Sequence, residues 1–72
     1  MGNLYSKTIE AFGWTAMKSI EALDALLAFK YNSELRVDIK TNKHFVVAND
    51  RPYYIQLEKI SDKGPFRAFV RI

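Results

Sequence analysis

The sequence predicts an α+β protein in which one long N-terminal helix packs on a four-stranded antiparallel meander sheet, with the strands in the order 1-2-3-4. Two observations predict this fold class. Apolar residues recur at helical spacing over the first part of the chain, and they alternate with polar residues over the second part. Neither a lone helix nor a lone sheet can bury its apolar side, so the helix is expected to lie across one face of the sheet.

The helix is expected over about residues 6–31, because its apolar residues are spaced by three or four positions: Ile9, Phe12, Ala16, Ile20, Leu23, Leu27 and Tyr31. Ser6 is the candidate N-cap, and the turn residues Asn32 and Ser33 are the expected stop. Gly13 is the weak point of this helix, where it costs about 1 kcal/mol relative to Ala. It marks either a kink or a place where another backbone comes close.

The strands follow where the period of the pattern changes to two, and they are expected at about residues 34–40, 44–49, 53–60 and 66–72. Turn-forming residues separate them, and the short connections favour antiparallel neighbours. The whole chain, 1–72, is expected to be a single domain. The predicted core joins the helix stripe to the inward strand positions: Ile9, Phe12, Ile20, Leu23, Leu27, Leu35, Val37, Phe45, Val47, Ile55, Leu57, Ala68 and Val70. The other strand side chains, Val46 and Phe69 among them, are expected on the outer face of the sheet.

The composition narrows the classes of function. The 72 residues are 49% hydrophobic and 26% charged, which is typical of a small globular domain, and the net charge is +3. Cysteine is absent, which excludes disulfides, thiolate metal sites and thiol nucleophiles. His44 is the only histidine, and the three glycines are too far apart for a phosphate-binding loop. We therefore predict no catalytic residues, no metal site and no cofactor.

The remaining signals point to a small non-catalytic binding protein, such as an accessory protein, adaptor or inhibitor of the kind that viruses and mobile elements encode. We expect it to dock on a protein partner of unknown identity and to form a homodimer. The back of the predicted helix supports this, because small residues and large aromatics replace the Lys and Glu of a solvated face. The candidate interface residues are Trp14, Lys18, Ala22, Ala25 and Phe29. The simpler interpretation is that Ala favours helices and that single exposed aromatics are common.

Two alternatives stay open. The outer face of the predicted sheet interleaves cations with aromatic rings, which is typical of single-strand nucleic-acid binders, although Asp38 and Glu58 on the same face oppose it. The residues concerned are Arg36, Lys40, Tyr54, Arg67, Phe69 and Arg71.

The second alternative is a lipid anchor. Residues 1–6 match the N-myristoylation pattern, with Gly2 as the acylated residue. One acyl chain binds membranes only marginally, so a second signal would be needed. Membrane contact is expected only if Gly2 is acylated. No run of eighteen apolar residues is present, and a cytoplasmic, intracellular location is expected.

Overall fold

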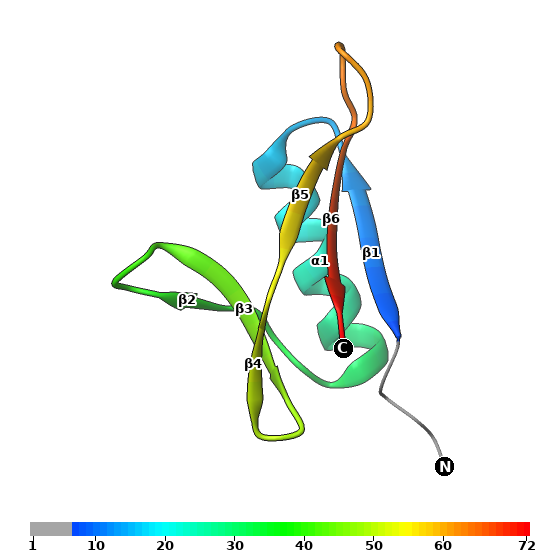
Figure 1. The fold of residues 1–72 in the computed structure, drawn as a ribbon. Helices are drawn as coiled ribbons and strands as arrows, with labels where there is room; N and C mark the ends of the chain where they lie inside the picture. Colours follow the sequence, from blue (N-terminus) through cyan, green and yellow to red (C-terminus); the bar gives the residue numbers. More distant parts are fainter. Residues whose placement is uncertain (1–6) are drawn as a thin grey trace.

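The computed structural model describes residues 7–72, which form one helix and six strands. Their bounds are β1 Thr8–Gly13, α1 Ala16–Tyr31, β2 Arg36–Asp38, β3 Lys43–Ala48, β4 Arg51–Tyr54, β5 Gln56–Lys59 and β6 Phe66–Arg71. The strands make two antiparallel three-stranded sheets, sheet A in the order β1-β6-β5 and sheet B in the order β2-β3-β4. The helix packs mainly against β1 and β6 of sheet A (Figure 1).

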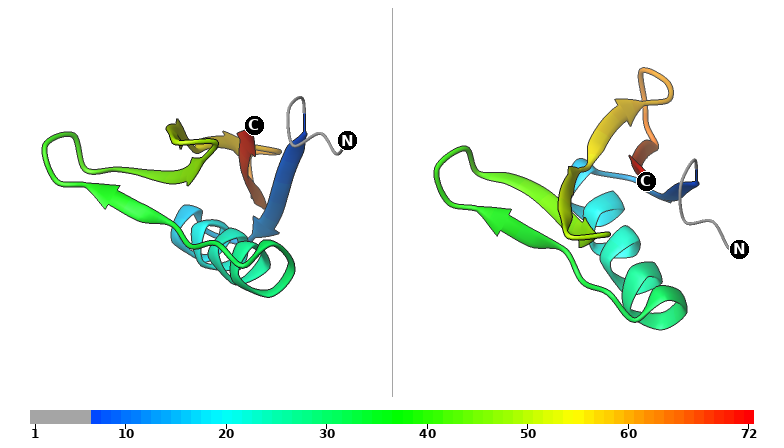
Figure 2. Two further views of the ribbon diagram at one scale, coloured as in Figure 1. Left: turned by 90° about the horizontal axis from the view of Figure 1, so that it is seen from below. Right: turned by 60° about the horizontal axis from the view of Figure 1, so that its bottom comes forward.

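One bent stretch of chain connects the two sheets. Only Ile55 separates β4 from β5, and its N–H donates to the carbonyl oxygen of His44 in β3 at 3.1 Å. The stretch therefore pairs with β3 before the bend and with β6 after it. As a result the hairpin arm, residues 36–48, extends away from α1 and sheet A (Figure 2).

The predicted 26-residue helix and the single four-stranded meander sheet are wrong. The helix has 16 residues, and residues 8–13 form β1 instead of its first turns. Thr8, Ile9 and Phe12 belong to residue types that favour strands, and Ile9 also fits a helical spacing, so the short segment is ambiguous by pattern. Its hydrogen-bond partner, β6, lies almost 60 residues further along the chain, where local periodicity cannot detect it.

The N-cap of the helix differs from the predicted one. The N-cap is Thr15, whose hydroxyl oxygen accepts from the Lys18 N–H at 3.1 Å. The predicted cap, Ser6, lies outside the described residues. The other end lies where the turn residues indicated, because Asn32 takes a left-handed φ of 53° directly after Tyr31.

Gly13 does not kink a helix; it allows a close backbone approach where β1 ends. A Cβ at this position would lie 2.6 Å from the Ser19 nitrogen and 2.7 Å from the Lys18 carbonyl carbon. The fully buried Ser19 hydroxyl lies 2.8 Å from the carbonyl oxygen of Phe66, 3.0 Å from that of Thr15 and 3.3 Å from that of Gly13. Its single proton serves one of these acceptors at a time, with Phe66 the nearest. Ser19 thus links the end of β1, the start of α1 and the start of β6.

The core lies between α1 and sheet A, with one residue added from the arm. It comprises Ile9, Leu23, Leu27, Val46, Ala68 and Val70. Four predicted core residues are instead largely exposed, namely Phe12, Val37, Val47 and Leu57, whereas Val46 and Phe69, expected on the outer face, are buried. In β3 all four residues 45–48 are apolar, so the sequence does not show which alternate set faces the core. In the structure it is Val46 that packs there. Leu57 stays exposed because α1 lies over β1 and β6 rather than over β5.

Replacing Leu23 with Ala tests this core. Leu23 is fully buried between α1 and sheet A, so we expect a loss of about 2–5 kcal/mol in the free energy of unfolding, measured by urea titration. Phe29→Ala on the same helix is the control, because its side chain is exposed and should change stability by less than about 1 kcal/mol. Equal losses in the two variants would contradict the observed helix face.

Gly13→Ala separates the observed strand end from the predicted helix by the sign of its effect. In a helix the substitution would stabilise the chain by about 1 kcal/mol. Against the backbone of Lys18 and Ser19, the new Cβ should instead destabilise it by about 1–3 kcal/mol. The midpoint of thermal unfolding gives the sign directly, and a rise would contradict this junction.

Candidate functional site

The outward side of α1 gathers four of the five predicted interface residues. Lys18, Ala25 and Phe29 are exposed, and Ala22 is half-buried. Phe29 is 92% exposed, so no described residue covers its ring. Eleven residues separate Lys18 from Phe29, which places them about 17 Å apart along the helix axis. We call this set, with Trp14, the helix docking face.

The prediction that Trp14 belongs to the helix is wrong: it precedes the helix, in the connection between β1 and α1. Its side chain is 71% exposed, yet its position is defined by the loop between β5 and β6. A Cβ added to Gly64 would lie 3.2 Å from the Trp14 carbonyl oxygen and 3.5 Å from its ring atom Cε3, and Gly64 has a φ of +87°. The indole is therefore held beside this loop while most of its surface faces solvent.

Two further apolar side chains, which the sequence analysis missed as surface residues, lie near Trp14 in the chain. Phe12 and Met17 are both more than half exposed. Phe12 was assigned to the core because of its helical spacing, and Met17 was assigned no role. The exposure of Phe12 follows from β1, whose alternation turns Ile9 and Ala11 toward the core and Phe12 away from it, whereas Met17 lies in the first turn of α1.

The predicted nucleic-acid residues do not form one surface. Arg36, Lys40 and Tyr54 belong to sheet B and its hairpin loop, whereas Arg67, Phe69 and Arg71 belong to β6 in sheet A. A single row of stacking rings and cations along one strand face is thus absent from the described residues.

The cations and the ring in β6 are largely engaged with their neighbours. The Arg67 guanidinium donates to Glu10 at 2.6 Å and to Glu58 at 2.9 Å. The hydrogen bonds that it donates to Glu58 and Glu10 raise the pKa of Arg67 above its ordinary value. The Phe69 ring is only 8% exposed, and the guanidinium carbon of Arg67 lies 4.1 Å from its centroid. A base has little of this ring left to stack on.

A polar contact joins Asp38 of the hairpin arm to Tyr54 of the neighbouring strand β4. The Tyr54 hydroxyl donates to one carboxylate oxygen of Asp38 at 3.0 Å, and the Lys40 N–H donates to the other at 3.0 Å. The backbone bond from Lys40 and the Tyr54 bond lower the pKa of Asp38, and the same bond to Asp38 raises the pKa of Tyr54. Tyr54 also packs against Phe45, with ring centroids 5.5 Å apart. These contacts fix the ionised Asp38 carboxylate on one face of the arm.

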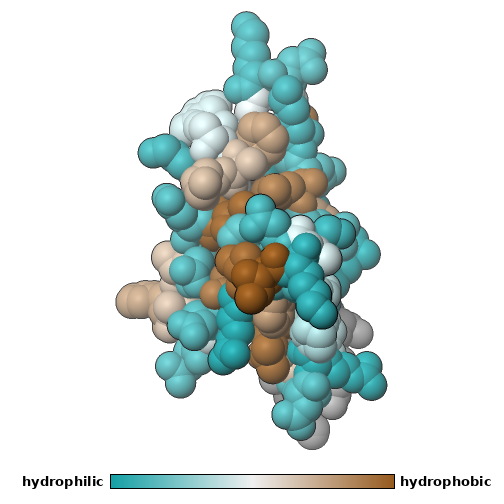
Figure 3. All heavy atoms as spheres, turned by 90° about the vertical axis from the view of Figure 1, so that its left-hand side faces the viewer, coloured by the Kyte–Doolittle hydropathy of each residue, from teal (hydrophilic) through white to brown (hydrophobic). Residues whose placement is uncertain are grey.

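Apolar side chains on β2 and in its loop remain uncovered. Val37 is 49% exposed and Ile39 is 91% exposed. Figure 3 shows hydrophobic atoms gathered at the centre of the face toward which the arm points. The arm therefore presents a second apolar surface, separate from the helix docking face.

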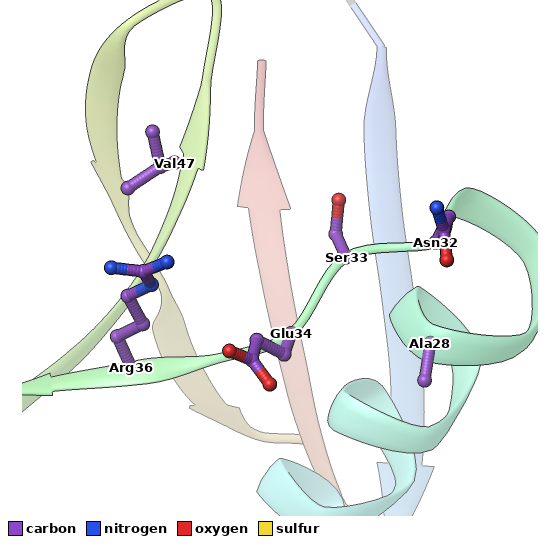
Figure 4. A pocket seen from close by; sticks show the side chains of 6 residues that line it. All are labelled: Ala28, Asn32, Ser33, Glu34, Arg36 and Val47. Atoms are coloured by element: carbon purple, nitrogen blue, oxygen red, sulfur yellow. The ribbon is translucent and has the colours of Figure 1, made fainter.

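An open groove lies where the arm leaves the helix (Figure 4). Its lining residues are Ala28, Asn32, Ser33, Glu34, Arg36 and Val47. Glu34 and Arg36 place one negative and one positive side chain at its rim, and Val47 adds apolar surface from β3. This combination provides a polar contact surface rather than a general acid and base held together.

Residues 7–72 hold neither a metal-binding cluster nor a membrane-spanning helix. Within this range no three His, Cys, Asp or Glu side chains gather closely enough to hold a metal ion. The single described helix is too short and too polar to cross a membrane. Gly2, the predicted acylation position, lies outside the described residues.

Comparisons with protein-family models, with curated proteins and with solved structures gave no match to this chain.

Tyr54→Phe tests the hydrogen bond in the arm. Without the Tyr54 hydroxyl we expect the pKa of Asp38 to rise toward its ordinary value of 3.8, as followed by NMR titration of the side-chain carboxyl carbon. In the wild type, the lowered pKa stabilises the fold above pH 3.8, and this contribution disappears as the pH falls through the folded-state pKa. Tyr53→Phe is the matched control and should leave the Asp38 titration unchanged.

Proposed function

We propose that this chain is a small, non-catalytic protein-binding protein that docks a partner protein onto the helix docking face. The observation that supports the proposal is the near-complete exposure of Phe29 on the outward side of α1, with a second exposed aromatic ring, Trp14, in the connection that precedes the helix. Large aromatic side chains that enter a partner's pockets contribute much of the energy of many interfaces. Between them the helix offers Ala22 and Ala25, which allow a second backbone to approach closely.

The chemistry of the face defines the partner it fits. Two apolar pockets would receive the Trp14 and Phe29 rings, and each ring buries about 150–250 Å². An acidic group near the middle would pair with Lys18, which forms no ion pair among the described residues. The partner is thus a protein with an apolar surface bordered by negative charge.

The other functional hypotheses have less support. For nucleic acid, the candidate residues are divided between two sheets and Arg67 is already paired with two carboxylates. Myristoylation of Gly2 and an intracellular location stay predictions from the sequence. An accessory, adaptor or inhibitor role describes the proposed docking protein without naming its target.

Site-specific photo-crosslinking in the source cell tests the docking proposal. A photoreactive amino acid at position 29 should give one defined protein adduct, and Trp14→Ala in the same chain should reduce its yield about tenfold or more. The control places the same photoreactive group at Lys63, which is exposed in the loop between β5 and β6. The proposal is wrong if both positions give the same adducts, if position 29 gives none, or if the adduct disappears on nuclease treatment.

A further inference from the structure

The free edge of β2 lies in the part of the molecule that projects furthest from the core. β2 is an outer strand of sheet B, and no other described segment pairs with its far side. The arm that holds it extends away from α1 and sheet A, so another molecule can approach along this edge (Figures 1 and 2). An exposed edge strand presents unpaired N–H and C=O groups with which a strand of another chain can pair.

The backbone of Val37 points toward this open edge. His44 lies opposite Val37 in the β2–β3 ladder, and the His44 carbonyl accepts from Ile55 on the β4 side. Because the backbone groups of His44 are turned toward β4, the pair formed by Val37 and His44 is a non-hydrogen-bonded one. The N–H and C=O of Val37 therefore point away from β3, and no described backbone group bonds to them.

The sequence of this segment is self-complementary about Val37. In an antiparallel pairing centred on this residue, every position meets its counterpart on the other side of the centre. Within β2, Arg36 of one copy meets Asp38 of the other on both sides of the axis, so opposite charges face each other there. Glu34 and Leu35 precede the strand, and Ile39 and Lys40 follow it in the turn between β2 and β3, so these four residues flank the paired segment.

We propose that two copies of this chain pair their β2 strands antiparallel about a twofold axis at Val37. The two Val37 residues exchange both backbone hydrogen bonds, with their Cα atoms about 5.5 Å apart. The sheets B of the two copies join into one six-stranded sheet in the order β4-β3-β2-β2-β3-β4.

The Asp38 carboxylate is already held in position in the single chain, before the proposed dimer forms. Tyr54 and the Lys40 N–H hold the Asp38 carboxylate in place, so little side-chain freedom is lost when Arg36 of the second copy pairs with it. The Arg36 side chain is exposed and has no carboxylate partner among the described residues. On the other face of the strand, the exposed Val37 and Ile39 side chains gain apolar neighbours.

The proposed β2-mediated dimer is independent of the docking function proposed for α1. The contact uses the arm, whereas the proposed partner protein uses α1. It also differs from the homodimer predicted from the sequence, which would form through the back of the helix. Ala22→Glu separates these two arrangements, because it should leave a β2-mediated dimer intact.

Cysteine trapping tests the twofold axis directly, because the chain has no cysteine of its own. In the proposed dimer Val37→Cys places two sulfurs across the axis at a Cα separation that a disulfide accepts. In Lys40→Cys the two sulfurs lie beyond opposite ends of the paired strands, because Lys40 follows β2 in the turn, and they are too far apart for a disulfide. We expect Val37→Cys to form a covalent dimer at least tenfold faster under mild oxidation.

Charge exchange tests the register. Arg36→Glu and Asp38→Lys each bring like charges together at both symmetric positions, so each variant alone should dimerise about tenfold more weakly in sedimentation velocity. Mixing the two variants restores opposite charges and should restore a heterodimer. Because Asp38→Lys also removes the Tyr54 bond, the pair Glu34→Lys and Lys40→Glu gives a second test at residues that flank β2, where the same sign of effect is expected with a smaller size.

Three outcomes would overturn the proposal. One is a wild-type chain that stays monomeric at about 1 mM, where even a small, weak interface would be populated. Another is equal disulfide formation at positions 37 and 40. The last is a dimer that Ala22→Glu dissociates while both charge-exchange pairs leave it unchanged.

Discussion

The close contact between Gly13 and the first turn of α1 is the constraint on which the rest of the fold depends. Without a side chain at position 13, β1 can end directly against the backbone of Lys18 and Ser19. The buried Ser19 hydroxyl then reaches the carbonyl oxygen of Phe66 at 2.8 Å and fastens the start of β6 to the same point. This junction fixes the angle at which α1 crosses sheet A, and so determines that Leu23 and Leu27 enter the core while Phe29 faces solvent.

The bend at Ile55 separates the molecule into two parts with different roles. Sheet A and α1 contribute most of the buried apolar side chains, and Val46 is the only member of the core cluster from sheet B. The arm thus gains only part of its stability from the core and depends on local contacts, such as the bond between Tyr54 and Asp38. A projecting segment with its own hydrogen bonds and uncovered apolar residues is well suited to contact another molecule.

Charged side chains are paired within sheet A but largely unpaired around β2. In sheet A, Glu10 and Glu58 neutralise Arg67 within the chain, and the flanking arginines cover the Phe69 ring. The charged side chains of residues 34–40 form no ion pairs within the described residues, although the order of their charges along the sequence is self-complementary. The arm and the helix docking face are therefore better suited to bind another molecule than the outer face of sheet A.

The sequence by itself determined the α+β class, the end of the helix at Tyr31, and the antiparallel pairings β2–β3, β3–β4 and β5–β6. These features follow from local periodicity and turn chemistry, which act within a few residues. The exposure of Phe29 also follows from the helical pattern, because it lies on the side away from the Leu23 and Leu27 stripe, whereas Trp14 lies before the helix and its exposure does not follow from that pattern. Only the tertiary structure decided that residues 8–13 form a strand, since their partner β6 lies almost sixty residues away. It likewise decided the phase of β3 and the division into two sheets, because the apolar run of residues 45–48 satisfies either phase until packing selects Val46.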